Sequence, residues 1–184
     1  MEHHSAAMQA NQSMQSMQIK AACEAVVLTF FHALDTRRHD AAAALMAPEG
    51  VWMRQGKRLC GPQEVLAALD ARAPERSTCH VITNLRLEAI EQAEDPANES
   101  MNEPTNKPAN KPTNNPAGGP TSNSTSKPAR ATVGYFLTAY DSVPQEQGGA
   151  PRLVSIRECR DVLVATPEGW RLADKSSRRH LPPE

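Results

Sequence analysis

The order of secondary-structure patterns between residues 19 and 90 constrains the fold of this chain more than any other feature of the sequence. A strand pattern at 51–54 is followed by a helix that Gly61-Pro62 opens, and then by an alternating strand at 80–90. Before them, residues 19–34 predict an amphipathic helix, because apolar side chains recur three and four residues apart: Cys23, Val26, Val27, Phe30, Phe31 and Leu34.

Two shorter patterns complete the first half of the chain. Asp40 suits the N-cap of a short second helix that runs to Met46, and Pro48 helps to end that helix. Gln55-Gly56-Lys57 predicts a turn after the first strand. The helix that follows turns Val65, Leu66 and Leu69 toward the core.

Three further strands are predicted at 130–141, 153–165 and 170–175. The element order is therefore helix, helix, strand, helix and four strands. This order is typical of an α+β domain in which a mostly antiparallel sheet wraps around the helices. Within the strand at 80–90, strict alternation puts His80, Ile82, Asn84 and Arg86 on one face and Val81, Thr83, Leu85 and Leu87 on the other.

Three segments lie outside this pattern. Residues 1–18 are polar, rich in Gln, Ser and Met, and are expected to form a disordered tail. Residues 93–130 lack Val, Ile, Leu, Cys and aromatic residues, and predict a long flexible loop between two strands. Residues 177–184 are expected to form a solvated C-terminal tail. A single domain then spans residues 19–176, interrupted by the 93–130 loop.

Composition narrows the classes of partner. The formal net charge is −1 and aromatic residues make up 4% of the chain, so neither a basic nor a base-stacking surface for nucleic acid is expected. No apolar run approaches the about 20 residues of a membrane span, and no secretory signal is evident. The expected location is the cytoplasm.

The four cysteines form no C-x-x-C pair, so a zinc or redox motif is not predicted. Buried free thiols in a reducing compartment are expected instead. His39 and His180 are expected on the surface, and no metal site is predicted.

Asp35 and His80 are the two titratable groups whose placement suggests chemistry, since one ends a helix and the other begins a strand. A carboxylate can orient an imidazole and favour its charged form, which is how proton-transfer dyads work. The alternatives are structural. Asp35 could pair with Arg37 or Arg38, and His80 could bond a backbone carbonyl. His32, on the same helix flank, could compete for Asp35 or lie at a pocket mouth.

Further residues are candidates to line a pocket, although each suits a plain core equally well: Phe31, Trp52, Met53, Leu66 and Ile82. In the charged run 157–161, alternation puts Arg157 and Cys159 on one face and Glu158 and Arg160 on the other. Arg157 or Arg160 could reach into the pocket and bind a carboxylate or an enolate. Alternatively, this charged run forms a polar dimer face.

The chain resembles the SnoaL-like branch of the nuclear transport factor 2-like superfamily. The residues that carry the resemblance are Leu34-Asp35 with Asp40, Val51-Trp52-Met53-Arg54, Gly61-Pro62-Gln63-Glu64-Val65, His80-Val81-Ile82-Thr83-Asn84 and Gly169-Trp170-Arg171-Leu172-Ala173. The resemblance implies a cone-shaped α+β barrel, with a curved, mostly antiparallel sheet around three N-terminal helices and a conical apolar pocket. It also implies pairing into a homodimer and no cofactor.

In the dehydratase members, an Asp near the end of the first helix holds a His on a following strand, and that His moves a proton. Asp35 and His80 occupy the matching places in this sequence. Those members also carry a Tyr one turn before the Asp, whereas this chain has Phe30. A replacement donor would be Tyr135, Tyr140 or a water molecule.

Three hypotheses follow. The first is a cofactor-free lyase (dehydratase) or isomerase that acts on a hydrophobic ring substrate with a carbonyl, through Asp35 and His80, with Tyr135 and Arg157 among the binding residues. The second is a non-enzymatic ligand-binding protein or dimeric scaffold, which the missing Tyr at position 30 favours. The third is an accessory subunit of a ring-hydroxylating oxygenase. Fold resemblance does not decide among them.

Overall fold

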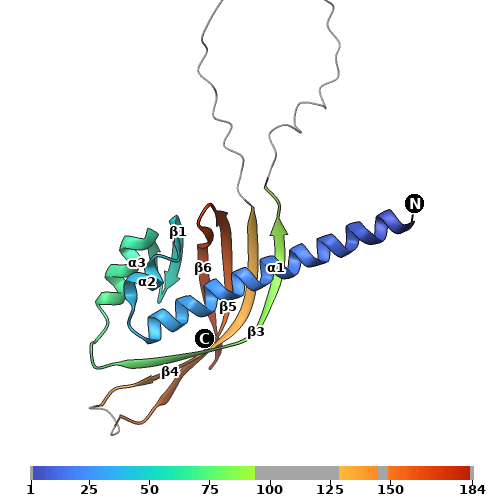
Figure 1. The fold of residues 1–184 in the computed structure, drawn as a ribbon. Helices are drawn as coiled ribbons and strands as arrows, with labels where there is room; N and C mark the ends of the chain where they lie inside the picture. The colour runs from blue at the N-terminus through green and yellow to red at the C-terminus, as the bar shows by residue number, and fades with distance from the viewer. Residues whose placement is uncertain (1, 94–128, 145–148, 183–184) are drawn as a thin grey trace, which may run out of the picture.

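The computed structural model describes residues 2–93, 129–144 and 149–182, with side chains described from Met8 onward. Three helices lie on one side of a single curved sheet of six strands, and the longest helix, α1, crosses the face of the sheet (Figure 1). The elements are α1 (Glu2–Asp35), α2 (His39–Ala43), β1 (Met46–Arg54), β2 (Lys57–Cys60), α3 (Gly61–Asp70), β3 (Ser77–Glu91), β4 (Arg130–Ser142), β5 (Arg152–Thr166) and β6 (Gly169–Leu181).

The sheet has the strand order β2-β1-β6-β5-β4-β3. All neighbours are antiparallel except β1 and β6, which are parallel, so the sheet is mixed. Since β2 and β3 are its two edges, the sheet is an open half-cone rather than a closed barrel. With this refinement, the predicted α+β cone around three helices is confirmed.

The core lies between α1 and the concave face of the sheet. Phe30 and Phe31 of α1 pack edge to face with ring centroids 5.5 Å apart, and Trp52 of β1 packs against Phe30 at 5.3 Å. Val65 and Leu69 of α3 are fully buried, as the spacing in this helix predicts. The two helical faces and the inner side of the sheet therefore form one continuous core.

Helix α1 starts at Glu2, so the prediction of a disordered tail over residues 1–18 is wrong for residues 2–18. The physical reason is composition: no Gly or Pro precedes Pro48, and Ala, Gln and Met are good helix formers. Residues 8–18 are nearly all exposed, so this part of α1 projects beyond the sheet (Figure 1).

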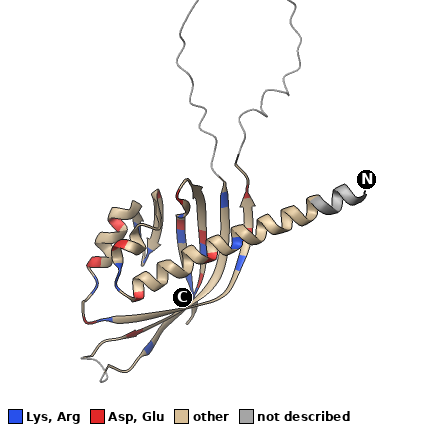
Figure 2. Cartoon of the chain, in the orientation of Figure 1, with Lys and Arg blue, Asp and Glu red and all other residues tan. Residues whose placement is uncertain are grey.

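By length and composition, residues Met8–Asp35 of α1 pass the test for a membrane-spanning helix, contrary to the expectation that no segment does. The core helix of a soluble protein can have the same length and apolar composition. Charges are sparse along α1 (Figure 2), with Lys20 and Glu24 paired at 3.3 Å. Cys23, Val27 and Phe30 are fully buried against the sheet, which accounts for the apolar stripe.

The bounds of several helices and strands differ from those predicted from the sequence. Strand β2 was not predicted; Lys57 begins this strand instead of completing a turn. Strand β6 runs to Leu181, so the expected C-terminal tail is strand over residues 177–181, and the domain extends beyond residue 176. Asp40 lies inside α2, whose N-cap is Arg38, because the chain leaves α1 in a left-handed turn that sets the start of α2 earlier. The predicted 93–130 loop lies almost entirely outside the described residues.

The strict alternation predicted for β3 is wrong beyond Thr83. Asn84 adopts a positive φ of 55°, and the register with β4 shifts between Thr83 and Arg86. A bulge of this kind moves the following side chains to the opposite face. Consequently His80 and Ile82 are half-buried in the first half of β3, and Leu85 and Leu87 are half-buried in the second.

Candidate functional site

The end of α1 is fixed by a capping motif that places Asp35 at the last helical position. The Arg38 N–H donates to Ala33 O at 2.8 Å and the Arg37 N–H to Leu34 O at 3.3 Å, the paired bonds of a Schellman motif. Arg37 takes the left-handed conformation that glycine usually supplies, with φ of 58°. Its guanidinium donates to Ala73 O and Arg76 O, which ties the helix end to the segment before β3.

The Asp35 carboxylate accepts three hydrogen bonds from β3. His80 Nδ1 lies 2.6 Å from Oδ1, the His80 backbone N–H donates to Oδ2 at 2.8 Å, and Thr78 Oγ1 donates to Oδ1 at 2.8 Å. Burial by itself raises the pKa of Asp35. The hydrogen bonds and charge of His80, with the Thr78 hydroxyl, outweigh that effect and hold this pKa below its ordinary value. Asp35 is therefore ionised at neutral pH.

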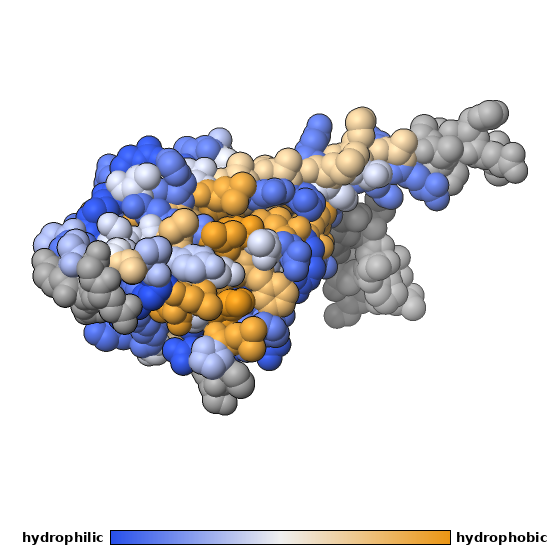
Figure 3. Space-filling view, turned by 90° about the horizontal axis from the view of Figure 1, so that it is seen from below, coloured by the Kyte–Doolittle hydropathy of each residue, from blue (hydrophilic) through white to orange (hydrophobic). Residues whose placement is uncertain are grey.

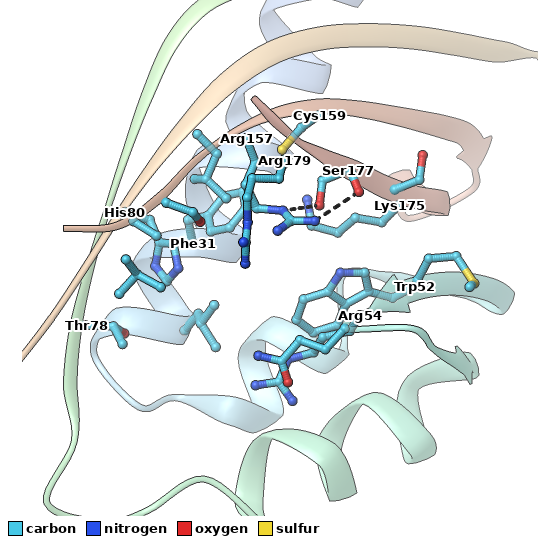
Figure 4. Close-up of a pocket in the computed structure, with 18 of the residues that line it drawn as sticks. Phe31, Trp52, Arg54, Thr78, His80, Arg157, Cys159, Lys175, Ser177 and Arg179 are labelled. Atoms are coloured by element: carbon cyan, nitrogen blue, oxygen red, sulfur yellow. Dashed lines mark hydrogen bonds between the residues drawn. The ribbon is translucent and has the colours of Figure 1, made fainter. Parts of the chain in front are cut away.

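This geometry fixes the orientation of the His80 ring. A carboxylate only accepts hydrogen bonds, so Nδ1 carries the proton in the 2.6 Å contact, and Nε2 is the nitrogen left for other chemistry. Within the described residues, Nε2 has no hydrogen-bond partner. The ring packs on Phe31 at a centroid distance of 5.1 Å and is half-buried on the wall of a cavity (Figure 4).

The cavity has a volume of about 220 Å³ and lies between β1, the segment before β3, and the strands β4, β5 and β6. Figure 4 shows Trp52 and Arg54 on one side and Arg157, Lys175 and Arg179 on the other. The apolar part of its wall consists of Phe31, Leu34, Trp52, Met53, Leu137, Ala139, Tyr140 and Val154. The rest of the wall is polar and rich in arginine. A concave site that combines apolar side chains with converging polar groups is a usual form of small-molecule site.

Only some of the residues that the sequence suggested for a pocket line the cavity. Phe31, Trp52, Met53 and Arg157 line the cavity together with His80. Leu66, Ile82 and Tyr135 do not line it: Leu66 and Ile82 pack against the core, and Tyr135 is fully buried behind the wall. His32 is exposed on the outside of α1, so it does not compete for Asp35.

Tyr135 belongs to a buried polar triad with Asp161 and Lys175. The Tyr135 hydroxyl donates to Asp161 Oδ2 at 2.9 Å, and Lys175 Nζ donates to the same oxygen at 2.8 Å and to the Tyr135 hydroxyl at 2.7 Å. Lys175 Nζ also lies 4.5 Å from the centroid of the Phe31 ring and 4.8 Å from that of Phe30. Burial is the main cause that raises the pKa of Tyr135, with the Asp161 charge adding to it. The Tyr135 hydroxyl therefore uses its proton in the bond to Asp161 within the triad.

Sequence patterns missed most of the cationic wall. Arg54, Arg72, Arg76, Lys175 and Arg179 all line the cavity, and none was singled out for it. One signal was present, because Arg54 lies two residues after Trp52 in a strand and therefore shares its face. Arg72 and Arg76 lie in an irregular segment, where no periodicity indicates a direction.

Other predictions about charged and polar residues have mixed outcomes. In β5, Arg157 and Cys159 line the cavity, whereas on the other face Glu158 accepts from Arg178 Nε at 2.8 Å. His39 is buried, 7% exposed, with Nδ1 2.8 Å from Asp70 Oδ1, so its expected surface position is wrong. Its place at the start of α2, facing α3, explains the burial.

The four thiols are free, but they do not share one environment as expected. Cys23 and Cys159 are buried, Cys60 is half-buried and Cys79 is exposed. Cys79 lies on the outer face of β3, between the inward-facing Thr78 and His80. In the part of the chain that the structure describes, no three His, Cys, Asp or Glu side chains converge as metal ligands.

Comparison of the sequence with known protein families finds a match for the part of the chain that contains Asp35 and His80. Residues 15–102 match the family description "SnoaL-like domain", a span that runs from α1 through β3 and includes both Asp35 and His80. Residues 15–102 are therefore similar to a SnoaL-like domain. The expected resemblance is confirmed, and no curated protein sequence matches the chain.

Solved structures show that the chain has the nuclear transport factor 2-like fold. A protein of that fold from Novosphingobium aromaticivorans, described as cystatin-like, has a TM-score of 0.64 at 12% identity, covering 95% of this chain and 90% of its own. A protein of the same organism, named provisionally as a scytalone dehydratase, has a TM-score of 0.63 at 12% identity, with 94% and 89% covered. ActVI-ORFA from Streptomyces coelicolor has a TM-score of 0.58 at 14% identity, with 89% and 98% covered. At these identities, the likeness concerns the fold.

Proposed function

We propose that this SnoaL-like protein is a cofactor-free dehydratase or isomerase that acts on a small hydrophobic ring compound with a carbonyl. The observation that carries the proposal is the contact of 2.6 Å between Asp35 Oδ1 and His80 Nδ1, on the wall of a cavity that is partly apolar. In this contact the ionised Asp35 fixes the tautomer of His80, so that Nε2 faces away from the carboxylate.

The proposed reaction begins when His80 Nε2 takes a proton from the carbon next to the substrate carbonyl. The electron pair of the broken C–H bond moves into an enolate, with its negative charge on the carbonyl oxygen. In a dehydration, the enolate collapses, the β-hydroxyl leaves, and His80 returns the proton to it as water forms. In an isomerisation, His80 returns the proton to a different carbon. Asp35 stabilises the imidazolium formed between the two transfers.

The enolate oxygen needs a hydrogen-bond donor or a positive charge. Phe30 cannot donate, and the Tyr135 hydroxyl is committed to Asp161. Arg157 is better placed, because it lines the cavity; its Nε donates to Ser177 Oγ at 2.8 Å and its Nη2 to Ser177 O at 3.2 Å. These bonds hold the guanidinium in place and leave other N–H groups for a ligand.

Proton exchange into a model ketone tests this proposal without knowledge of the natural substrate. 2-Tetralone is incubated with the protein in D2O, and deuterium at the carbon next to the carbonyl is followed by mass spectrometry. We expect His80→Gln to reduce protein-dependent exchange about 100-fold or more, as for loss of a general base. The control is His32→Gln, because His32 is an exposed histidine outside the cavity. Full exchange in His80→Gln that still folds would refute the proposal.

A second candidate is a non-enzymatic ligand-binding protein. The observation that favours it is Phe30, fully buried against Trp52 where the dehydratases of the family place a Tyr. For this candidate, 2-tetralone or a related ketone would bind and leave unchanged. Exchange that depends on Asp35 and His80 would exclude it.

Pairing into a homodimer and a cytoplasmic location remain predictions. Light scattering coupled to gel filtration tests the first, because a dimer doubles the mass of 20.0 kDa. Apolar side chains are gathered on the face shown in Figure 3, bordered by hydrophilic residues, and such a face is a candidate for the dimer contact.

The predicted cytoplasmic location is tested by fractionation of the source cells.

A further inference from the structure

The cavity wall carries a large excess of positive charge. Six cationic side chains line it, and no Asp or Glu of the described residues does. The six are Arg54, Arg72, Arg76, Arg157, Lys175 and Arg179. A site for a purely neutral hydrophobic ring would not need this charge, so the excess calls for an explanation.

Only two of these six cations have a carboxylate partner in the described part of the chain. Arg76 Nη2 lies 2.7 Å from Asp141 Oδ2, and Lys175 Nζ lies 2.8 Å from Asp161 Oδ2. Asp141 also pairs with Arg152, whose Nε lies 2.7 Å from Asp141 Oδ1. Among the described residues, no carboxylate lies within ion-pair distance of Arg54, Arg72, Arg157 or Arg179.

Arg54 of β1 and Arg72, in the segment before β3, are half-buried in the cavity wall and form no ion pair with the described residues. Arg54 Nη1 donates to Ala68 O at 3.2 Å, and Arg72 donates to Leu34 O at 3.2 Å and to Thr78 Oγ1 at 2.9 Å. All three acceptors are uncharged. These bonds orient both guanidinium groups, and neither group forms an ion pair with a carboxylate of the described residues.

The arginines also lie close enough to repel one another. Burial is the main cause that lowers the pKa of Arg72; the charges of Arg54, Arg76 and Arg37 lower it further, and the charge of Asp35 offsets this in part. Burial and the charge of Arg76 lower the pKa of Arg54 in the same way. Half-buried charges of one sign are costly, and a bound anion would relieve that cost.

Arg72 is connected to His80 through a chain of hydrogen bonds. Arg72 donates to Thr78 Oγ1, Thr78 donates to Asp35, and Asp35 accepts from His80 Nδ1. Arg72, Thr78 and His80 all line the same cavity. Trp52 lies beside Arg54, with the Arg54 guanidinium carbon 5.4 Å from the centroid of the Trp52 ring. An anion on these arginines would place an attached ring against Trp52 and on the His80 side of the cavity.

We propose that the cavity binds a cyclic organic acid through its carboxylate, which Arg54 and Arg72 hold while the ring packs on Trp52 and Phe31. A carboxylate suits this place because the planar guanidinium binds its two oxygens side by side. The proposal deepens the proposed function by naming the substrate as an acid, and in that respect it rests on that function. The binding itself does not depend on catalysis.

The test compares matched probes that differ in charge and little in shape. Binding of 2-naphthoate, 2-naphthamide and 2-naphthyl phosphate is measured by calorimetry, with benzoate and benzamide as one-ring equivalents. We expect the acid of at least one pair to bind 10-fold or more tightly than its amide, because hydrogen bonds to a charged group are stronger than neutral ones. We also expect the phosphate to bind no more tightly than the naphthoate.

Variants assign the effect to the two arginines. Arg54→Gln and Arg72→Gln should each reduce acid affinity about 10-fold and leave amide affinity within about 2-fold. Arg58→Gln is the matched control, because Arg58 is an exposed arginine of β2 outside the cavity. If Arg72→Gln fails to fold, since it also bonds Leu34 O and Thr78, Arg54→Gln still decides the question.

Acid and amide of equal affinity in both pairs would overturn the inference, as would an acid preference that survives Arg54→Gln. Tighter binding of the phosphate would overturn the carboxylate in favour of a phosphoester. His80→Gln separates the two proposals, since it should abolish proton exchange and leave 2-naphthoate affinity within about 3-fold. Acid binding without exchange in the unmodified protein would refute the catalytic proposal alone.

Discussion

Asp35 contacts His80 with both oxygens of its carboxylate, Oδ1 at 2.6 Å from the ring Nδ1 and Oδ2 at 2.8 Å from the backbone nitrogen. One side chain at the last residue of α1 therefore sets both the orientation of an imidazole and the position of the strand that carries it. The same contact that prepares a proton-transfer group also joins the helix to the sheet. Structural and chemical roles of Asp35 should therefore be separable by experiment.

Asp35→Asn should lower the free energy of unfolding by about 2 kcal/mol, because an amide replaces the acceptor of three hydrogen bonds, at least one of them charge-assisted. Urea unfolding followed by circular dichroism measures the change. The control is Asp40→Asn in the exposed first turn of α2, where less than about 0.5 kcal/mol is expected. Equal effects of the two substitutions would show that the Asp35 contacts contribute little.

The pH dependence of stability should also report Asp35. Its pKa lies below the ordinary value of 3.8, so the folded state binds its proton less readily than the unfolded state does. Its contribution is therefore fully present above about pH 4 and is lost as the pH falls below 3.8 through the folded pKa. Unfolding between pH 2 and pH 6 should show a shallower decline in Asp35→Asn than in the unmodified protein. Parallel curves would contradict this assignment.

The fold was largely predictable because its signals are local. The three-and-four spacing of α1 and the Gly-Pro start of α3 follow from chain geometry alone. Gly61 has a φ of 69°, and a Cβ there would lie 2.8 Å from Pro48 O, so this glycine is required. The face change in β3 was not predictable, since it depends on one left-handed residue, Asn84, whose conformation the surrounding sheet fixes.

The candidate site was predictable only where a residue's place in an element sets its direction. Asp35 ends a helix and His80 lies near the start of a strand, so their proximity could be suggested. Arg72 and Arg76 lie between α3 and β3, where no period applies. The partner of Asp161 depends on the β5–β6 register, which pairs it with Lys175. Long-range register of this kind is not visible in one sequence.

The four cysteines should differ sharply in reactivity. Burial raises the pKa of Cys23 to about 11 and that of Cys159 to about 11, so both stay protonated and unreactive at neutral pH. Cys79 is exposed and should react with Ellman's reagent in the folded protein, with Cys60 slower. All four should react in urea. Rapid reaction of a third thiol in the folded state would indicate that the cavity wall opens at Cys159.

The N-terminal turns of α1 should contribute little to stability. Residues 8–15 are exposed, and an isolated helical extension is marginal in water. Deletion of residues 2–14 should therefore lower the free energy of unfolding by less than about 1 kcal/mol. Helical circular dichroism should decrease in proportion to the helix removed. A large loss of stability would instead show that these turns pack against a second copy of the chain, and light scattering would then show the dimer dissociating.

Lys175 should be far more important to folding than an ordinary surface lysine. It is 3% exposed, and its ammonium pairs with Asp161, a carboxylate with no exposed surface whose Oδ1 has no hydrogen-bond partner in the described structure. Lys175→Met leaves that charge buried without a cation, with only the Tyr135 hydroxyl still donating to it, so we expect a loss of about 3–5 kcal/mol in urea unfolding at pH 7. Burial raises the pKa of Asp161, and a carboxyl of this kind favours the folded state only while it is protonated. The variant should therefore regain stability as the pH is lowered from 7.

The double variant Lys175→Met with Asp161→Asn should lose less stability than the sum of the losses in the two single variants, because it removes both charges. Additive losses, or a loss below about 1 kcal/mol in Lys175→Met, would refute a structural ion pair.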